Sequence, residues 1–194
     1  MFNIGGGIRG WVFRVLVLAA GGLLLYTWFL PWWQAYIEEL KEIAIIIRPW
    51  AFDNFVPPDM VYLIAGVEDA MPAWFFTFMW VYLGAVVLAL LVSLFVSSAK
   101  GINIGRFRIS LPTALIGAAG LSYIGVVIAA VIVISMKAGM FWDAPLQGKV
   151  YVEESMEHAS YVMTSLQTGF YLACATGPIL VVLAILRRFI VGKA

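Results

Sequence analysis

The sequence predicts an all-α membrane protein whose four transmembrane helices form two hairpins. Three observations support this fold class: the composition, a long uncharged stretch at residues 111–136, and the sorting of charges between the loops. Of the 194 residues, 63% are apolar and 12% are charged. Average soluble domains contain about 25% charged residues. We therefore expect a single membrane domain covering residues 1–194.

Residues 111–136 are the clearest single span. They contain no ionisable side chain, and Lys137 follows them directly. Because a helix rises about 1.5 Å per residue, roughly 20 apolar residues cross the hydrocarbon core of a bilayer. An open strand would leave backbone groups unpaired in lipid, so the expected structure is a helix.

Three further spans are predicted at about residues 11–33, 73–98 and 160–186. The first follows a short basic segment and is typical of an uncleaved signal anchor. Pro72 is suited to the first turn of the second span. Pro178 lies inside the last span, where a proline removes a backbone hydrogen bond and kinks the helix.

The first outer loop is predicted to hold an amphipathic helix over residues 34–50. Its acidic residues lie largely opposite a set of larger apolar side chains at helical spacing, which are Tyr36, Leu40, Ile43 and Ile47. Ile45 falls on the wrong side of this helix. We expect the helix to lie in the membrane interface or over the bundle.

The charges divide the loops into two sets. One set carries only basic residues, namely Arg9, Arg14, Lys100, Arg106, Arg108, Arg187, Arg188 and Lys193. The other carries all 11 acidic residues together with Lys41, Arg48, Lys137 and Lys149. Short loops rich in Lys and Arg stay in the cytoplasm. We therefore predict a multi-pass cell-membrane protein with both termini cytoplasmic and the two larger loops outside.

The two halves of the chain, about residues 1–100 and 101–194, share short words in the same order. The clearest are Asn3-Ile4-Gly5 with Asn103-Ile104-Gly105, and Val67-Glu68-Asp69-Ala70-Met71 with Val152-Glu153-Glu154-Ser155-Met156. A collinear order of this kind favours a tandem repeat of two hairpins. Because both hairpins enter from the same side, the repeat axis would lie along the membrane normal.

Acidic residues precede the second and fourth spans and are the weak candidates for a metal site. The candidates in the second group are Glu153, Glu154, Glu157 and His158, and on a helix Glu154 and His158 would share a face. Three or more ligands are usual for a metal, and this chain has one histidine. The favoured interpretation is that these acids cap helix N-termini, so we expect no bound metal.

Several kinds of chemistry are not expected from this sequence. The predicted spans lack central ionisable groups, which disfavours an ion pump, and one histidine excludes haem ligation by paired intramembrane histidines. A formal charge of +1 argues against nucleic acid as a partner. No phosphate-binding loop or nucleophile–base pair is recognisable. We therefore expect neither an enzyme nor a cofactor.

Small residues recur where helices would pack closely in lipid. The candidate helix-packing residues are Gly21, Gly84, Ala114, Ala118, Ser122, Ala173 and Gly177. Such spacing allows helix backbones to approach each other, and close packing holds helices together in a bilayer.

Four spans, cytoplasmic termini and a longer first outer loop give a layout that resembles that of the claudin-like tetraspans. The Trp…Gly-Leu-Trp signature and the paired loop cysteines of that family are absent, since Cys174 is the only cysteine. The resemblance covers the layout alone and implies no activity, cofactor or partner.

These observations predict a non-catalytic membrane subunit that packs against and stabilises a larger membrane complex, for which a respiratory or other redox complex is one option. Its partners would be the lipid bilayer and other integral membrane subunits. One alternative is an outward-facing membrane protein that binds a small ligand or a cation. Another is a structural tetraspan that associates with itself.

Overall fold

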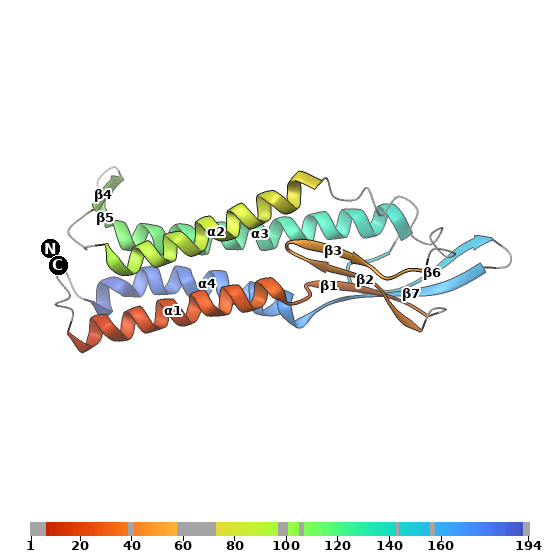
Figure 1. Cartoon of the computed structure of the whole chain (residues 1–194), viewed down its shortest axis with the longest axis horizontal. Coiled ribbons are helices and arrows are strands. Elements are labelled where there is room, and N and C mark those ends of the chain that lie inside the picture. The colour runs from red at the N-terminus through yellow and green to blue at the C-terminus, as the bar shows by residue number, and fades with distance from the viewer. Residues whose placement is uncertain are drawn as a thin grey trace. The chain divides into compact units, whose positions relative to one another are not determined.

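The computed structural model describes residues 7–38, 41–57, 73–96, 101–104, 107–142, 144–155 and 158–191. These residues form four long helices, which are α1 (Ile8–Phe29), α2 (Ala73–Phe95), α3 (Leu111–Trp142) and α4 (Thr168–Ile190) (Figure 1). Each contains a segment long and apolar enough to cross a membrane. This confirms the prediction of four apolar helices of membrane-spanning length.

The chain divides into two compact units. A helical unit contains Met1–Tyr26, Val81–Val126 and Ala173–Ala194, and a strand-containing unit contains Thr27–Trp80 and Val127–Leu172. Each long helix contributes residues to both units.

In the helical unit, one apolar side of each helix is buried against its neighbours. The buried side chains include Phe13, Val17, Leu24, Leu83, Val86, Leu90, Ile116, Tyr123 and Leu180. Large apolar side chains on the other sides of the same helices stay exposed, as expected for surfaces in contact with lipid.

Polar contacts join Ser110, the residue just before α3, to Thr113 in the first turn of α3 and to Arg187 near the end of α4. The Arg187 guanidinium donates to Ser110 Oγ at 3.0 Å, and the Ser110 and Thr113 hydroxyls are 2.8 Å apart. The same guanidinium lies 5.8 Å from the centre of the Phe13 ring on α1. A two-stranded ribbon of β4 (Gly101–Ile104) and β5 (Phe107–Ser110) directly precedes α3.

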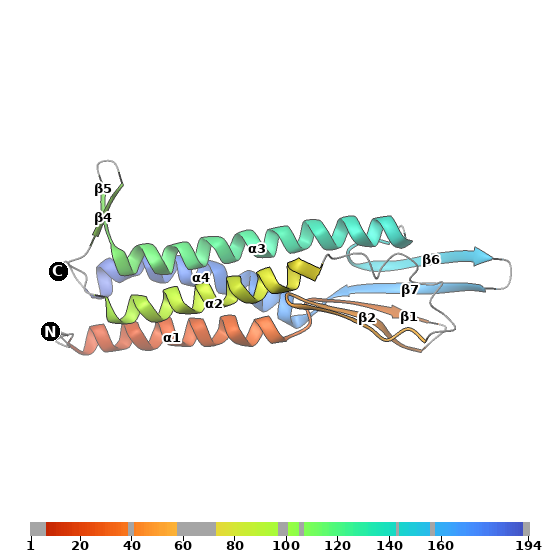
Figure 2. The same ribbon diagram turned by 45° about the horizontal axis from the view of Figure 1, so that its top comes forward.

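The strand-containing unit holds a five-stranded antiparallel sheet with the order β3-β2-β1-β7-β6 (strands labelled in Figure 1; Figure 2 shows the same ribbon turned by 45°). The strands are β1 (Trp33–Ile37), β2 (Glu42–Arg48), β3 (Ala51–Asn54), β6 (Gly148–Ser155) and β7 (His158–Leu166). The central pair, β1 and β7, joins the α1–α2 connection to the α3–α4 connection.

One face of this sheet packs against the C-terminal part of α3. Trp33, Ala35 and Ile37 of β1 are buried together with Ile134 and Ala138 of α3. The Trp33 Nε1–H donates to the Leu146 carbonyl at 2.9 Å, so its polar atom is satisfied within the apolar core. This core occupies the face of the sheet toward α3, so the side chains of the opposite face lie outside it.

The prediction of an amphipathic helix at residues 34–50 is wrong, because these residues form β1, β2 and the start of the turn after β2. The run of isoleucines is β-branched and favours a strand. Ile45, which did not fit the helical pattern, is buried beside Ala44 where the β1–β2 register shifts after Ala35. A bulge of this kind puts two successive side chains on the buried side.

The fourth helix also begins later than predicted. Residues 160–166 belong to β7, and α4 begins at Thr168. In β7, Val162 and Thr164 are buried while Tyr161 and Met163 are exposed, which is the period of two of a strand. The all-α class is therefore wrong for the two longer connections, which pair to form the sheet.

Candidate interaction surface on the sheet

Those weak metal-ligand candidates that the structure describes lie on strands and not on a helix. Glu153 and Glu154 belong to β6 and His158 to β7, where His158 is paired with Ser155. Glu157 and the first acidic pair, Glu68 and Asp69, lie outside the described residues. Among the side chains that are described, no group of three His, Cys, Asp or Glu residues could hold a metal ion.

Of the predicted helix-packing residues, Gly177 lies at a close crossing of α3 and α4. A Cβ atom at Gly177 would lie 2.6 Å from Ile124 Cγ1 and 3.2 Å from the Gly120 carbonyl oxygen. A Cβ atom at Gly120 would lie 2.9 Å from the Gly177 carbonyl oxygen and from Val181 N. Gly120 was missed by the sequence analysis, although it lies in the same small-residue stretch. These glycines allow the two backbones to approach.

The other predicted packing residues have varied environments. Ala173 is buried, Ala114 is half-buried and Ala118 is exposed. A Cβ atom at Gly21 would make an ordinary contact with Leu90, whereas one at Gly84 would meet no atom within 4 Å.

Ser122, the remaining predicted packing residue, takes part in hydrogen bonds. It accepts one from the Tyr82 hydroxyl at 3.1 Å and donates to the Ala119 carbonyl at 3.0 Å. Ser122 thus links α2 and α3 by a polar contact, which satisfies the tyrosine hydroxyl within a candidate span.

In the part of the chain that the structure describes, the face of the sheet opposite α3 carries side chains that lie outside the buried core, and we call it the open face. Strand register and alternation place on it Gln34, Tyr36, Glu38, Ile43, Ile46, Lys149, Tyr151, Tyr161, Met163 and Ser165. One cross-strand row runs from Ile43 through Tyr36 and Met163 to Lys149. Four large apolar members of this face, Ile43, Tyr151, Tyr161 and Met163, are between 38% and 51% exposed.

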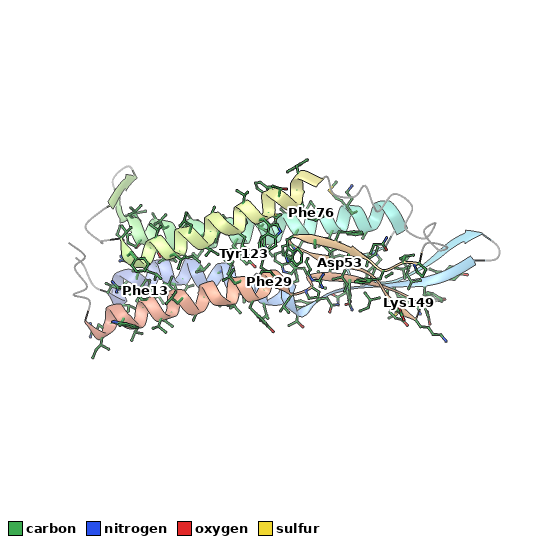
Figure 3. All side chains as sticks on the ribbon, viewed as in Figure 1. Phe13, Phe29, Asp53, Phe76, Tyr123 and Lys149 are labelled. Carbon is green, nitrogen blue, oxygen red and sulfur yellow. The ribbon has the colours of Figure 1, made fainter. Side chains whose placement is uncertain are left out.

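Two exposed tyrosines form an aromatic pair on the open face. Tyr151 of β6 is paired with Tyr161 of β7, and their ring centroids are 5.0 Å apart. The Lys149 ammonium lies 3.8 Å from the centre of the Tyr161 ring and also donates to Glu38 Oε2 at 3.0 Å (Figure 3). The charged groups here neutralise each other beside an aromatic pair.

Hydrogen bonds on both edges of β7 fix the backbone that carries Tyr161. The Thr164 hydroxyl of β7 donates to the Pro145 carbonyl at 2.7 Å, just before β6 begins. The Glu38 N–H donates to the Tyr161 carbonyl at 2.9 Å and continues the β1–β7 ladder. These hydrogen bonds fix the strand register, and with it the backbone positions of Tyr151 and Tyr161.

The sequence analysis did not identify Tyr151, Tyr161 or Met163 as candidate site residues. The available signal was the alternation of small or β-branched and large residues in Tyr161-Val162-Met163-Thr164, which is typical of a half-buried strand. Assigning the same residues to a membrane span concealed that alternation.

The open face combines exposed tyrosine and methionine side chains with a lysine–glutamate ion pair. Tyrosine and methionine are enriched in protein interfaces, whereas lysine and glutamate are depleted from them, so the apolar residues are the interface-like part of this face. No protein-family model matches the chain, and a search of curated proteins finds no significant match.

Proposed function

We propose that this protein is a non-catalytic, multi-pass membrane subunit that binds a protein partner through the open face of its sheet. The observation that carries the proposal is the exposed Tyr151–Tyr161 pair with Met163 beside it on a fixed support. Aromatic side chains bury about 150–250 Å² each when covered. Exposed apolar patches of several hundred Å² mark interaction sites.

The open face is too polar to face the hydrocarbon core of a bilayer. Lys149, Glu38, Gln34 and Ser165 lie among its apolar members. Charged groups are costly in lipid, whereas an ion pair is tolerated at the rim of a protein interface. A protein surface is therefore a better occupant of this face than lipid tails.

The pairing of Lys149 with Glu38 also narrows the chemistry of the partner. An internally neutralised pair offers little to a charged ligand, so selectivity comes from shape and from apolar contact. The partner surface that fits is flat, neutral and rich in aliphatic or aromatic side chains. In this proposal the chain contributes packing to a membrane complex and performs no reaction of its own.

The test is a site-specific photo-crosslinker in native membranes. A crosslinking amino acid at position 161 should give one dominant product with a foreign subunit. A matched control at position 88 should give only diffuse lipid products, because Leu88 is exposed on a candidate membrane helix. Absence of a protein product at position 161 would refute the proposal.

Two differently tagged copies of the chain separate a foreign partner from self-association. If the product at position 161 joins the two tags, the open face binds a second copy and the protein is a self-associating tetraspan. Replacing Tyr151 and Tyr161 by alanine should weaken recovery of a foreign partner by at least about 30-fold, since each central tyrosine typically contributes 1 kcal/mol or more.

A further inference from the structure

A shallow apolar groove runs along the first turns of α1. Its volume is about 360 Å³, and the residues that line it are Ile8, Trp11, Val12, Val15 and Leu16. Side chains at this spacing lie on one face of a helix. All five are exposed, by between 41% and 86%. They belong to a candidate membrane span, so the groove lies on a surface that a bilayer would surround.

The opposite face of α1 packs inside the helical unit. Phe13, Val17 and Ala20 are buried there, each at 5% exposure or less. Because an α-helix turns by about 100° per residue, Val17 lies roughly 180° around the helix from Ile8. The groove therefore points away from the other helices of this unit. Lipid acyl chains are the apolar groups that a bilayer supplies to such a face.

Two arginines border the groove, one on each flank. Arg9 lies one turn before Val12 and two turns before Leu16, whereas Arg14 lies one turn after Trp11 on the other flank. Arg9 is exposed and Arg14 is half-buried. A long arginine side chain covers apolar surface with its stem and keeps its guanidinium group in the polar headgroup layer.

No carboxylate neutralises these two arginines. The ion pairs among the described residues are those of Arg48 and Lys149, both in the strand-containing unit. The sequence gives the reason, since none of the three segments of the helical unit contains an Asp or a Glu. Basic side chains beside a membrane span attract anionic lipids. The amine of a zwitterionic headgroup would find no acidic partner here.

We propose that the start of α1 is a binding site for an anionic phospholipid. One acyl chain lies in the groove along Val12, Val15 and Leu16. The phosphate of the headgroup accepts hydrogen bonds from Arg9 and Arg14, a pairing that is strong for guanidinium groups. The apolar groove holds the lipid in place, and the two arginines select its negative charge.

The experiment is photo-crosslinking of the full chain in nanodiscs that contain equal amounts of phosphatidylglycerol and phosphatidylcholine. A diazirine analogue of leucine replaces Leu16 or, as the matched control, Leu88. Both are exposed leucines on candidate membrane helices, so the analogue fits at either position. Mass spectrometry then gives the ratio of the two lipid adducts. Phosphatidylglycerol should exceed phosphatidylcholine about 25-fold at position 16, from about fivefold for each arginine, and neither should exceed the other at position 88.

Substitutions of the arginines test the headgroup contacts. Arg9→Gln should lower the ratio at position 16 about fivefold, and Arg9→Gln with Arg14→Gln should bring it to the value at position 88. Lys149→Gln also removes one positive charge, from β6, and should leave the ratio unchanged. Because Arg9 is exposed, its single substitution decides if the double variant proves unstable in a thermal scan.

Four results would each overturn the proposal. These are equal lipid ratios at positions 16 and 88, an unchanged ratio in Arg9→Gln, an equal loss in Lys149→Gln, and a crosslink from position 16 to a second copy of the chain in place of lipid.

Discussion

The close crossing of α3 and α4 gives a quantitative prediction for Gly120→Ala. The added Cβ would lie 2.9 Å from the Gly177 carbonyl oxygen, from Val181 N and from Val181 Cγ2. Carbon atoms in good contact lie about 3.5–4.0 Å apart, so relief requires the helices to separate by several tenths of an ångström. Two of these neighbours are backbone atoms, and neither can rotate away.

Gly84→Ala is the matched control, since its Cβ would meet no atom within 4 Å. Both substitutions remove a helical glycine and gain about 0.8–1 kcal/mol of helix propensity. Their difference therefore isolates the steric cost at Gly120, which overpacking data put at about 1–3 kcal/mol. For a chain of this length, the Gly120 variant should melt roughly 2–12 °C below the Gly84 variant.

The assay is thermal unfolding of both variants and the wild type in one detergent, followed by circular dichroism. The Gly84 variant should match or exceed the wild type, and the Gly120 variant should melt clearly below the Gly84 variant. Equal melting temperatures for the two alanine variants would refute the close α3–α4 crossing at Gly120.

Three further stability predictions follow from contacts in the strand-containing unit, each read by the same thermal scan. Gly169→Ala should lower the free energy of unfolding by about 2 kcal/mol or more, because its Cβ would lie 2.5 Å from the Pro31 carbonyl oxygen. An unchanged melting temperature would contradict this contact. Trp33→Phe should cost about 1–3 kcal/mol by leaving the Leu146 carbonyl without its donor, and no loss would show that water replaces it. Lys149→Gln should change stability by less than about 1 kcal/mol, since its ion pair is exposed; a larger loss would mean the pair is structural.

The four helices could be predicted from the sequence because lipid imposes a simple requirement on the chain. A segment such as residues 111–136 must satisfy all its backbone groups internally, and only its length and polarity matter. The end of α3 was less predictable. It continues to Trp142 because Ile134 and Ala138 pack on the sheet. Nothing in the sequence of residues 111–136 indicates that this sheet exists.

The sheet was missed because its central pairing joins distant parts of the chain. Trp33 is paired with Leu166, and a register of this kind leaves no local trace in the sequence. Tertiary pairing also decided between helix and strand at residues 34–50, where helical spacing and alternation both fit in part. Ile45 was the local sign of the error, since its burial requires the bulge beside Ala44.

Membrane topology underlies the proposed role of the open face, and cysteine labelling in intact cells tests it most directly. Cys174, the only cysteine, lies in a candidate span and should resist a membrane-impermeant maleimide. In a Cys174→Ser background, a cysteine at position 149 should label from outside, and one at position 9 should label only after permeabilisation. Labelling of position 9 in intact cells, with position 149 protected, would contradict the account.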